Sequence, residues 1–179
     1  MYIQYVEELI YQLDSLTKSF DKMDNIIQIA NKMNRNKNIF IIGNGGSAAT
    51  AIHFAADLNK SAKLRARALV ENISEITAIS NDSDYNAIFL NQLKNHAVIE
   101  DVLVAISCSG NSENIMRAVN WAKDNGVFVI GLTGFDGGYL SKMADMNITI
   151  GSDNIRICED IHLTICHMLT QKLSGDMIG

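Results

Sequence analysis

The 179-residue sequence has no proline, only three cysteines, no cluster of basic residues and no long apolar run. Cys108, Cys158 and Cys166 form an odd set without CxxC spacing. We therefore expect reduced thiols, and neither a disulfide framework nor a structural zinc site built on cysteine. Because proline is absent, every turn must be formed by Gly, Asn, Asp or Ser.

Charge and hydropathy exclude two classes of partner. The net charge of -5 comes without any basic patch, so the sequence predicts no binding to nucleic acid or to an anionic membrane surface. No segment approaches the ~20 apolar residues that a membrane-spanning helix needs, and the acidic N-terminal segment lacks the pattern of a signal peptide. We therefore expect a cytoplasmic protein that folds as one domain over residues 1–179.

The hydrophobic pattern alternates between the periods of helices and strands. Within 1–34, residues 2–34 have helical periodicity and predict an N-terminal helical extension. In the remaining core, 35–179, short apolar runs predict five strands at 38–42, 66–70, 102–106, 127–132 and 146–150. Helical patterns occur at 47–59, 84–97, 112–125, 138–143 and 155–174. This alternation predicts an α/β fold, a flavodoxin-like, doubly wound, five-stranded parallel sheet with helices on both faces.

Ligands of such folds bind beyond the carboxyl ends of the strands, in the loops that lead into helices. Four of these loops are polar: GNGGSAAT after the first strand, ISNDSDYN at 79–86, SCSGNSEN after 102–106, and TGFDGGYL at 133–140. Glycines in the first loop permit close backbone approach, and a helix that begins near Ser47 offers free N–H groups to an anion. The third loop places the hydroxyls of Ser107, Ser109 and Ser112 around a second helix start.

Two interpretations of these loops are open. No lysine follows a GxxxxG, and GNGGSA is not GxGxxG, so nucleotide binding is the weaker hypothesis. Serines at helix starts also serve as ordinary N-caps. Because two such loops follow two strands of one parallel sheet, we favour a phosphate site over simple capping.

Histidines and carboxylates on two helices are candidates for chemistry. His53 and Asp57 lie one turn apart on one helix face, an arrangement that suits either a surface pair or a site. The last helix carries Glu159, His162 and His167. At ~100° per residue, its two histidines point about 140° apart and should not share a site.

Two histidines and two carboxylates would suit zinc or another divalent first-row ion. The difficulty is reach, because about 12 Å separates Glu159 from His167 along an ideal helix. Either Glu159 lies at an irregular helix start, or more than one chain supplies the ligands.

Together, the segments GNGGSAATAIHFAADL, NDSDYNAIF, AISCSGNSENIMRAV, GLTGFDGG and EDIHLTICH resemble the sugar isomerase (SIS) domain family, and within it the phosphoheptose isomerases. The resemblance runs in unbroken order from about residue 20 to residue 174. It implies isomerisation of sedoheptulose 7-phosphate to a D-glycero-manno-heptose 7-phosphate, a step toward activated heptose for lipopolysaccharide, capsule or another surface glycan. It also implies a homotetramer with active sites between subunits and one zinc ion per subunit.

The resemblance assigns roles to individual residues. His53 matches the metal-binding histidine and His167 the catalytic histidine, and the zinc hypothesis takes His53, Asp57, Glu159 and His167 as ligands. The implied substrate-binding residues are Asn44, Gly45, Gly46, Ser47, Asn81, Asp82, Ser107, Cys108, Ser109, Ser112 and Glu159. For the acid/base pair, the hypothesis takes His167 with either Asp57 or Glu159.

The chain departs from the family at two of these positions. Relatives usually have Glu where Asp57 stands and Gln where Glu159 stands, and Ser61 occupies the place of a family arginine. Because a displacement of ~1 Å in a proton-transfer group can cost on the order of 10²-fold in rate, the departures leave open which carboxylate is the base.

Ketose–aldose isomerisation moves a proton between C1 and C2 through an enediol, so it needs two proton-exchanging groups and a stabiliser for the oxyanion. Two other functions stay open: isomerisation of a different ketose phosphate, and a non-catalytic tetrameric scaffold that binds a protein partner, as some relatives bind a replication initiator. The presence of His53, Asp57 and His167 favours an enzyme.

Overall fold

The computed structural model describes residues 2–33 and 36–175. Its five strands form one all-parallel sheet in the order β2-β1-β3-β4-β5, which is the flavodoxin order, so the predicted fold class is confirmed. The strands are β1 (Ile39–Gly43), β2 (Ala66–Ala68), β3 (Val102–Ser107), β4 (Phe128–Thr133) and β5 (Met146–Thr149).

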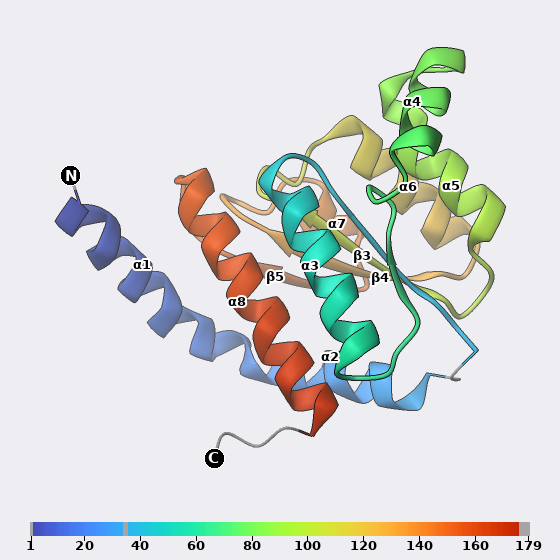
Figure 1. Ribbon diagram of the computed structural model, residues 1–179. Coiled ribbons are helices and arrows are strands. Elements are labelled where there is room, and N and C mark those ends of the chain that lie inside the picture. Colours follow the sequence, from blue (N-terminus) through green and yellow to red (C-terminus); the bar gives the residue numbers. More distant parts are fainter. Residues whose placement is uncertain (1, 34–35, 176–179) are drawn as a thin grey trace.

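Helices cover both faces of the sheet (Figure 1). They are α1 (Tyr2–Leu16), α2 (Phe20–Lys32), α3 (Gly46–Lys60), α4 (Ile73–Asp82), α5 (Ile88–His96), α6 (Glu113–Asp124), α7 (Leu140–Met143) and α8 (Ile155–Ser174), with 3-10 turns at Thr17–Ser19 and Tyr85–Ala87. One apolar cluster joins α2, α3 and α8 to one face of the sheet, and a second joins α5, α6 and α7 to the other. The long α1 runs beside α8 at one side of the molecule. No helix in the described ranges is both long and apolar enough to cross a bilayer.

The prediction was wrong around residues 79–86. Residues 79–82 are not loop but the end of α4, a helix that the hydrophobic pattern did not predict. The missed signal is local: Asn72 is the N-cap, and its side chain accepts a hydrogen bond from the backbone N–H of Glu75 at 3.3 Å. The helix predicted from residue 84 instead starts as a 3-10 turn at Tyr85–Ala87. Residue 34, the predicted end of the N-terminal helices, lies outside the described residues.

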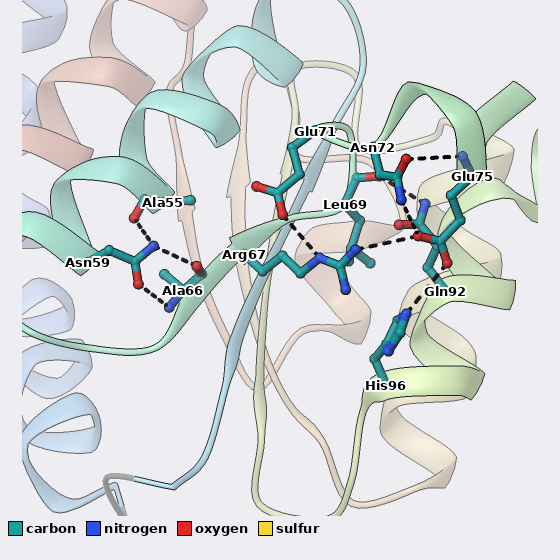
Figure 2. A network of polar contacts seen from close by, with 10 residues as sticks. All are labelled: Ala55, Asn59, Ala66, Arg67, Leu69, Glu71, Asn72, Glu75, Gln92 and His96. Carbon is teal, nitrogen blue, oxygen red and sulfur yellow. Dashed lines mark hydrogen bonds and ion pairs between the residues drawn. The ribbon is translucent and has the colours of Figure 1, made fainter.

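Polar contacts hold the edge strand β2 in place (Figure 2). Asn59 of α3 donates to the Ala66 carbonyl at 2.7 Å and accepts from the Ala66 N–H at 3.1 Å. Beside it, Arg67 pairs with Glu75 of α4, and His96 of α5 lies 3.5 Å from the same carboxylate. These contacts blunt the free edge of the sheet. His96 belongs to them and is not part of the cluster of His53, Asp57 and His167.

His162 is a buried histidine of the core. Its Nε2–H donates to the Thr133 carbonyl at 3.0 Å, while its Nδ1 has no hydrogen-bond partner among the described residues. Burial lowers the pKa of His162 to about 4, although the hydrogen bond to Thr133 opposes the shift. The expectation that His162 and His167 do not share a site is therefore confirmed.

This burial predicts acid sensitivity. In the unfolded chain His162 has a pKa near ~6.5 and becomes protonated as the pH falls through that value. In the folded chain His162 stays neutral until the pH falls to about 4. Stability is thus intact above pH ~6.5 and falls below it, by about 2 kcal/mol between pH 7.5 and pH 5. Denaturant unfolding at both pH values should show a smaller drop for His162→Gln, which keeps a donor for Thr133. An equal drop in both proteins would contradict this account.

Candidate functional site

Helices α3 and α8 bring three of the predicted residues together. The Nε2 atoms of His53 and His167 lie 3.0 Å apart, and Asp57 Oδ2 is 3.3 Å from His53 Nε2. The two imidazole rings meet edge to face with centroids 5.1 Å apart. One ligand atom from each of the three residues lies within 4.8 Å of the other two. In the sequence, His53 and Asp57 precede His167 by 114 and 110 residues. The cluster is accessible, since His53 and His167 are exposed.

This cluster has the donor set of a metal site. Two imidazole nitrogens and a carboxylate oxygen are a common three-ligand zinc set that leaves one coordination position open. The two facing Nε2 atoms support the assignment, because neutral imidazoles can share only one N–H between them, whereas a metal ion accepts both lone pairs.

Glu159 lies outside this cluster within a single chain. It sits in the second turn of the α-helix Ile155–Ser174, so the alternative of an irregular helix start does not apply. Its carboxylate rests directly on Gly46 at the start of α3, where an added Cβ would lie 2.3 Å from Glu159 Oε1. Only the second alternative remains for Glu159 as a metal ligand, namely that a different chain supplies it.

The glycine loop and the serine loop form one hollow of about 140 Å³. It is lined by Asn44, Ser47, Ile106, Ser107, Cys108, Ser109, Ser112, Phe135, Ile155 and Glu159. Six of the predicted substrate residues thus come together from these two loops, joined by Glu159 from α8. Gly45, at positive φ (54°), is the N-cap of α3 and turns the chain so that the first N–H groups of α3 begin beside Ser47.

The three serines of the third loop make different local contacts. Ser112 is the N-cap residue of α6, yet its side chain makes no capping hydrogen bond. Ser107 and Ser109 accept from the N–H groups of Gly110 and Asn111 at 3.2 Å, which orients both hydroxyls. The capping interpretation therefore fails for Ser112, whose hydroxyl is available at a helix N-terminus, the position that favours an anion.

Asn81 and Asp82 are placed differently. Both are exposed at the end of α4, Asn81 Nδ2 donates to Asp82 Oδ1 at 2.9 Å, and neither lines the hollow. From the same segment, Tyr85 does reach the site: its hydroxyl donates to Asn44 Oδ1 at 3.0 Å. Asn114 also contacts Asn44. Neither residue was named as a candidate, although Tyr85 lies in the polar loop ISNDSDYN and Asn114 in the polar loop SCSGNSEN; the sequence does not show which side chains of these loops turn toward Asn44.

Cys108 is a buried residue of the hollow. A hydrogen bond to Cys158 and burial raise the pKa of the Cys108 thiol, and burial also raises the pKa of Cys166 on α8. Both are therefore protonated at neutral pH, which agrees with their interpretation as lining or core residues and not as nucleophiles.

The family follows from comparison with known proteins. The profile of the SIS domain family matches residues 1–134. This chain belongs to the SIS domain family. A phosphoheptose isomerase of Aliarcobacter butzleri is 36% identical to it over 94% of this chain and 97% of its own length. One from Helicobacter hepaticus is 40% identical over 90% of this chain and 84% of its own length.

Solved structures agree with the assignment of this SIS protein. The phosphoheptose isomerase GmhA of Neisseria gonorrhoeae superimposes with a TM-score of 0.87 at 30% identity, covering 97% of both chains. The resemblance to the phosphoheptose isomerases is therefore confirmed, and it extends over the α1 and α8 helices as well as the sheet.

Proposed function

We propose that this SIS protein is an aldose–ketose isomerase that converts sedoheptulose 7-phosphate into D-glycero-manno-heptose 7-phosphate, for activated heptose used in a surface glycan. The observation that carries the proposal is the cluster of His53, Asp57 and His167 on the two helices that also border the serine-lined hollow. The relatives and the solved structure that resemble the chain over nearly all its length are named phosphoheptose isomerases.

The position of Glu159 supports an active site shared between subunits. Glu159 borders the hollow of its own chain, and about 12 Å along α8 separates it from His167. If Glu159 of a second copy completes the ligand set, the hollow of that copy comes beside the His53, Asp57 and His167 of the first. One substrate molecule could then bind with its phosphate in the hollow of one chain and its reacting carbons beside the histidines of the other chain. On this basis we propose that subunits share their active sites, and the resemblance to the phosphoheptose isomerases supplies the proposal of four subunits.

The side chains and backbone of the protein bind the substrate and transfer its protons. The serine hydroxyls and the first N–H groups of α3 and α6 hold the phosphate and anchor the open-chain sugar. A carboxylate, Asp57 or Glu159, removes a proton from C1 while the C2 oxygen is protonated, and the enediol then gains a proton at C2 as the C1 hydroxyl loses one. His167 exchanges the protons at the two oxygens. A zinc ion held by His53, Asp57, Glu159 and His167 would supply Lewis-acid polarisation of those oxygens.

The test is a panel of ketose phosphates followed by proton NMR. We expect turnover of sedoheptulose 7-phosphate, a loss of at least about 10-fold after chelation and dialysis, and recovery on adding Zn²⁺. Turnover of a shorter ketose phosphate in place of the seven-carbon sugar would support the alternative isomerase. No turnover of any sugar, with or without metal, would favour a non-catalytic scaffold.

A further inference from the structure

We propose that Asn114 and Tyr85 position Asn44 and restrict its side-chain amide to donating a hydrogen bond into the hollow. The proposal rests on the proposed function, because it gives Asn44 an oxygen of a sugar phosphate as its ligand. Asn44 follows β1, Tyr85 lies on the 3-10 turn between α4 and α5, and Asn114 is in the first turn of α6. Three segments that are distant in the sequence thus meet at one amide.

A backbone N–H sets the orientation of both amides. The N–H of Ile115 can only donate, and it lies 2.9 Å from Asn114 Oδ1, which identifies that atom as the oxygen. Asn114 Oδ1 then accepts from Asn44 Nδ2 at 2.9 Å, and Asn114 Nδ2 donates to Asn44 Oδ1 at 2.9 Å. Asn114 is only 2% exposed, so a reversed amide would set two donors against each other away from water.

The hydrogen-bond capacity of Asn44 is almost used up. An amide oxygen has two acceptor positions, and those of Asn44 Oδ1 are taken by Asn114 Nδ2 and by the Tyr85 hydroxyl at 3.0 Å. One of the two N–H bonds of Asn44 Nδ2 goes to Asn114 Oδ1. A single N–H is left, on a residue that lines the hollow. Its partner must be an acceptor, either a phosphate oxygen or a sugar oxygen.

The turn that carries Tyr85 is itself held against α6. Asp84, the residue before Tyr85, forms an ion pair at 3.2 Å with Arg117, which lies on the same helix as Asn114. Tyr85 is 54% exposed, so burial of its ring does not explain its placement. The hydroxyl contact with Asn44 is the polar interaction that distinguishes this tyrosine from a phenylalanine.

Tyr85→Phe tests the proposal, because it removes one hydroxyl and keeps the ring. We expect kcat/KM to fall about 5-fold, mostly through a higher KM, as one hydrogen bond of ordinary strength would predict. Asn114→Asp, which keeps the acceptor for Ile115 but cannot donate to Asn44, should lower kcat/KM further. The matched control is Tyr139→Phe. Tyr139 is exposed, and its hydroxyl makes no hydrogen bond within the described ranges, so this variant should keep the wild-type kcat/KM.

A double-mutant cycle separates positioning from general structure. In an Asn44→Ala background, Tyr85→Phe should have no further effect on kcat/KM. An equal loss in both backgrounds, or no loss in the wild-type background, would overturn the proposal. The inhibition constant of inorganic phosphate assigns the acceptor: a weaker inhibition in Tyr85→Phe indicates a phosphate oxygen, and an unchanged one indicates a sugar oxygen.

Failure of the proposed function gives a different result. Wild-type protein that turns over no ketose phosphate would end that proposal, and NMR of the Asn44 side-chain amide would then decide the positioning role. We expect Tyr85→Phe to shift both Asn44 Nδ2 proton resonances while Tyr139→Phe leaves them in place. Resonances that do not respond to Tyr85→Phe would overturn the inference.

Discussion

Replacing His167 with alanine is expected to lower kcat for isomerisation by at least about 10²-fold, because general acid–base groups contribute on the order of 10² to 10⁴. The same substitution removes one of the three ligand atoms of the cluster, so the bound metal measured by mass spectrometry should fall with the rate. His167 is exposed, so the variant should fold and unfold like the wild type.

His96→Ala is the matched control for this experiment. His96 is also an exposed helical histidine beside a carboxylate, but it lies in the contacts around β2 shown in Figure 2. Its removal should change neither the rate nor the metal content. An undiminished rate in His167→Ala would remove His167 from the mechanism, and an equal loss in both variants would point to a general effect of histidine removal.

The substitutions Asp57→Asn and Glu159→Gln distinguish between the two carboxylates that are candidates for the catalytic base. Asp57→Asn should lower kcat by at least about 10²-fold, because Asp57 adjoins both histidines and its amide neither accepts a proton nor binds a cation strongly. Glu159→Gln installs the residue that the family usually has, and should stay within about 10-fold of the wild-type rate. Rates with sedoheptulose 7-phosphate and metal content would be measured side by side.

The opposite result would assign the base differently. A large loss in Glu159→Gln with a tolerated Asp57→Asn would make Glu159 the base and show that this chain has moved the role from one helix to the other. Gly46 sets the place of Glu159, because a side chain at that position would meet its carboxylate. The pair of substitutions therefore tells whether Asp57 reaches the substrate despite being one methylene shorter than the family's Glu.

Much of the fold was predictable because the hydrophobic period is a local property. Apolar runs located all five strands, and the last helix was predicted with the bounds that the structure has, Ile155–Ser174. The exception, α4, has no fully buried residue, and its apolar stripe is short, with Ile76 and Ile79 packed only partly against the core. Its N-cap, Asn72, is a second local signal for this helix.

The candidate site was predictable in its parts and not in its assembly. Glycines and serines after parallel strands determine, by sequence alone, that Ser47 and Ser112 stand at helix starts on one edge of the sheet, because parallel strands end together. Which distant side chains touch depends on how the helices pack and rotate, which only the tertiary structure decides. Packing of α3 on α8 joins His53 to His167 and leaves Glu159 against Gly46. The same is true of Asn44, whose donor role is set by partners 41 and 70 residues away in the chain.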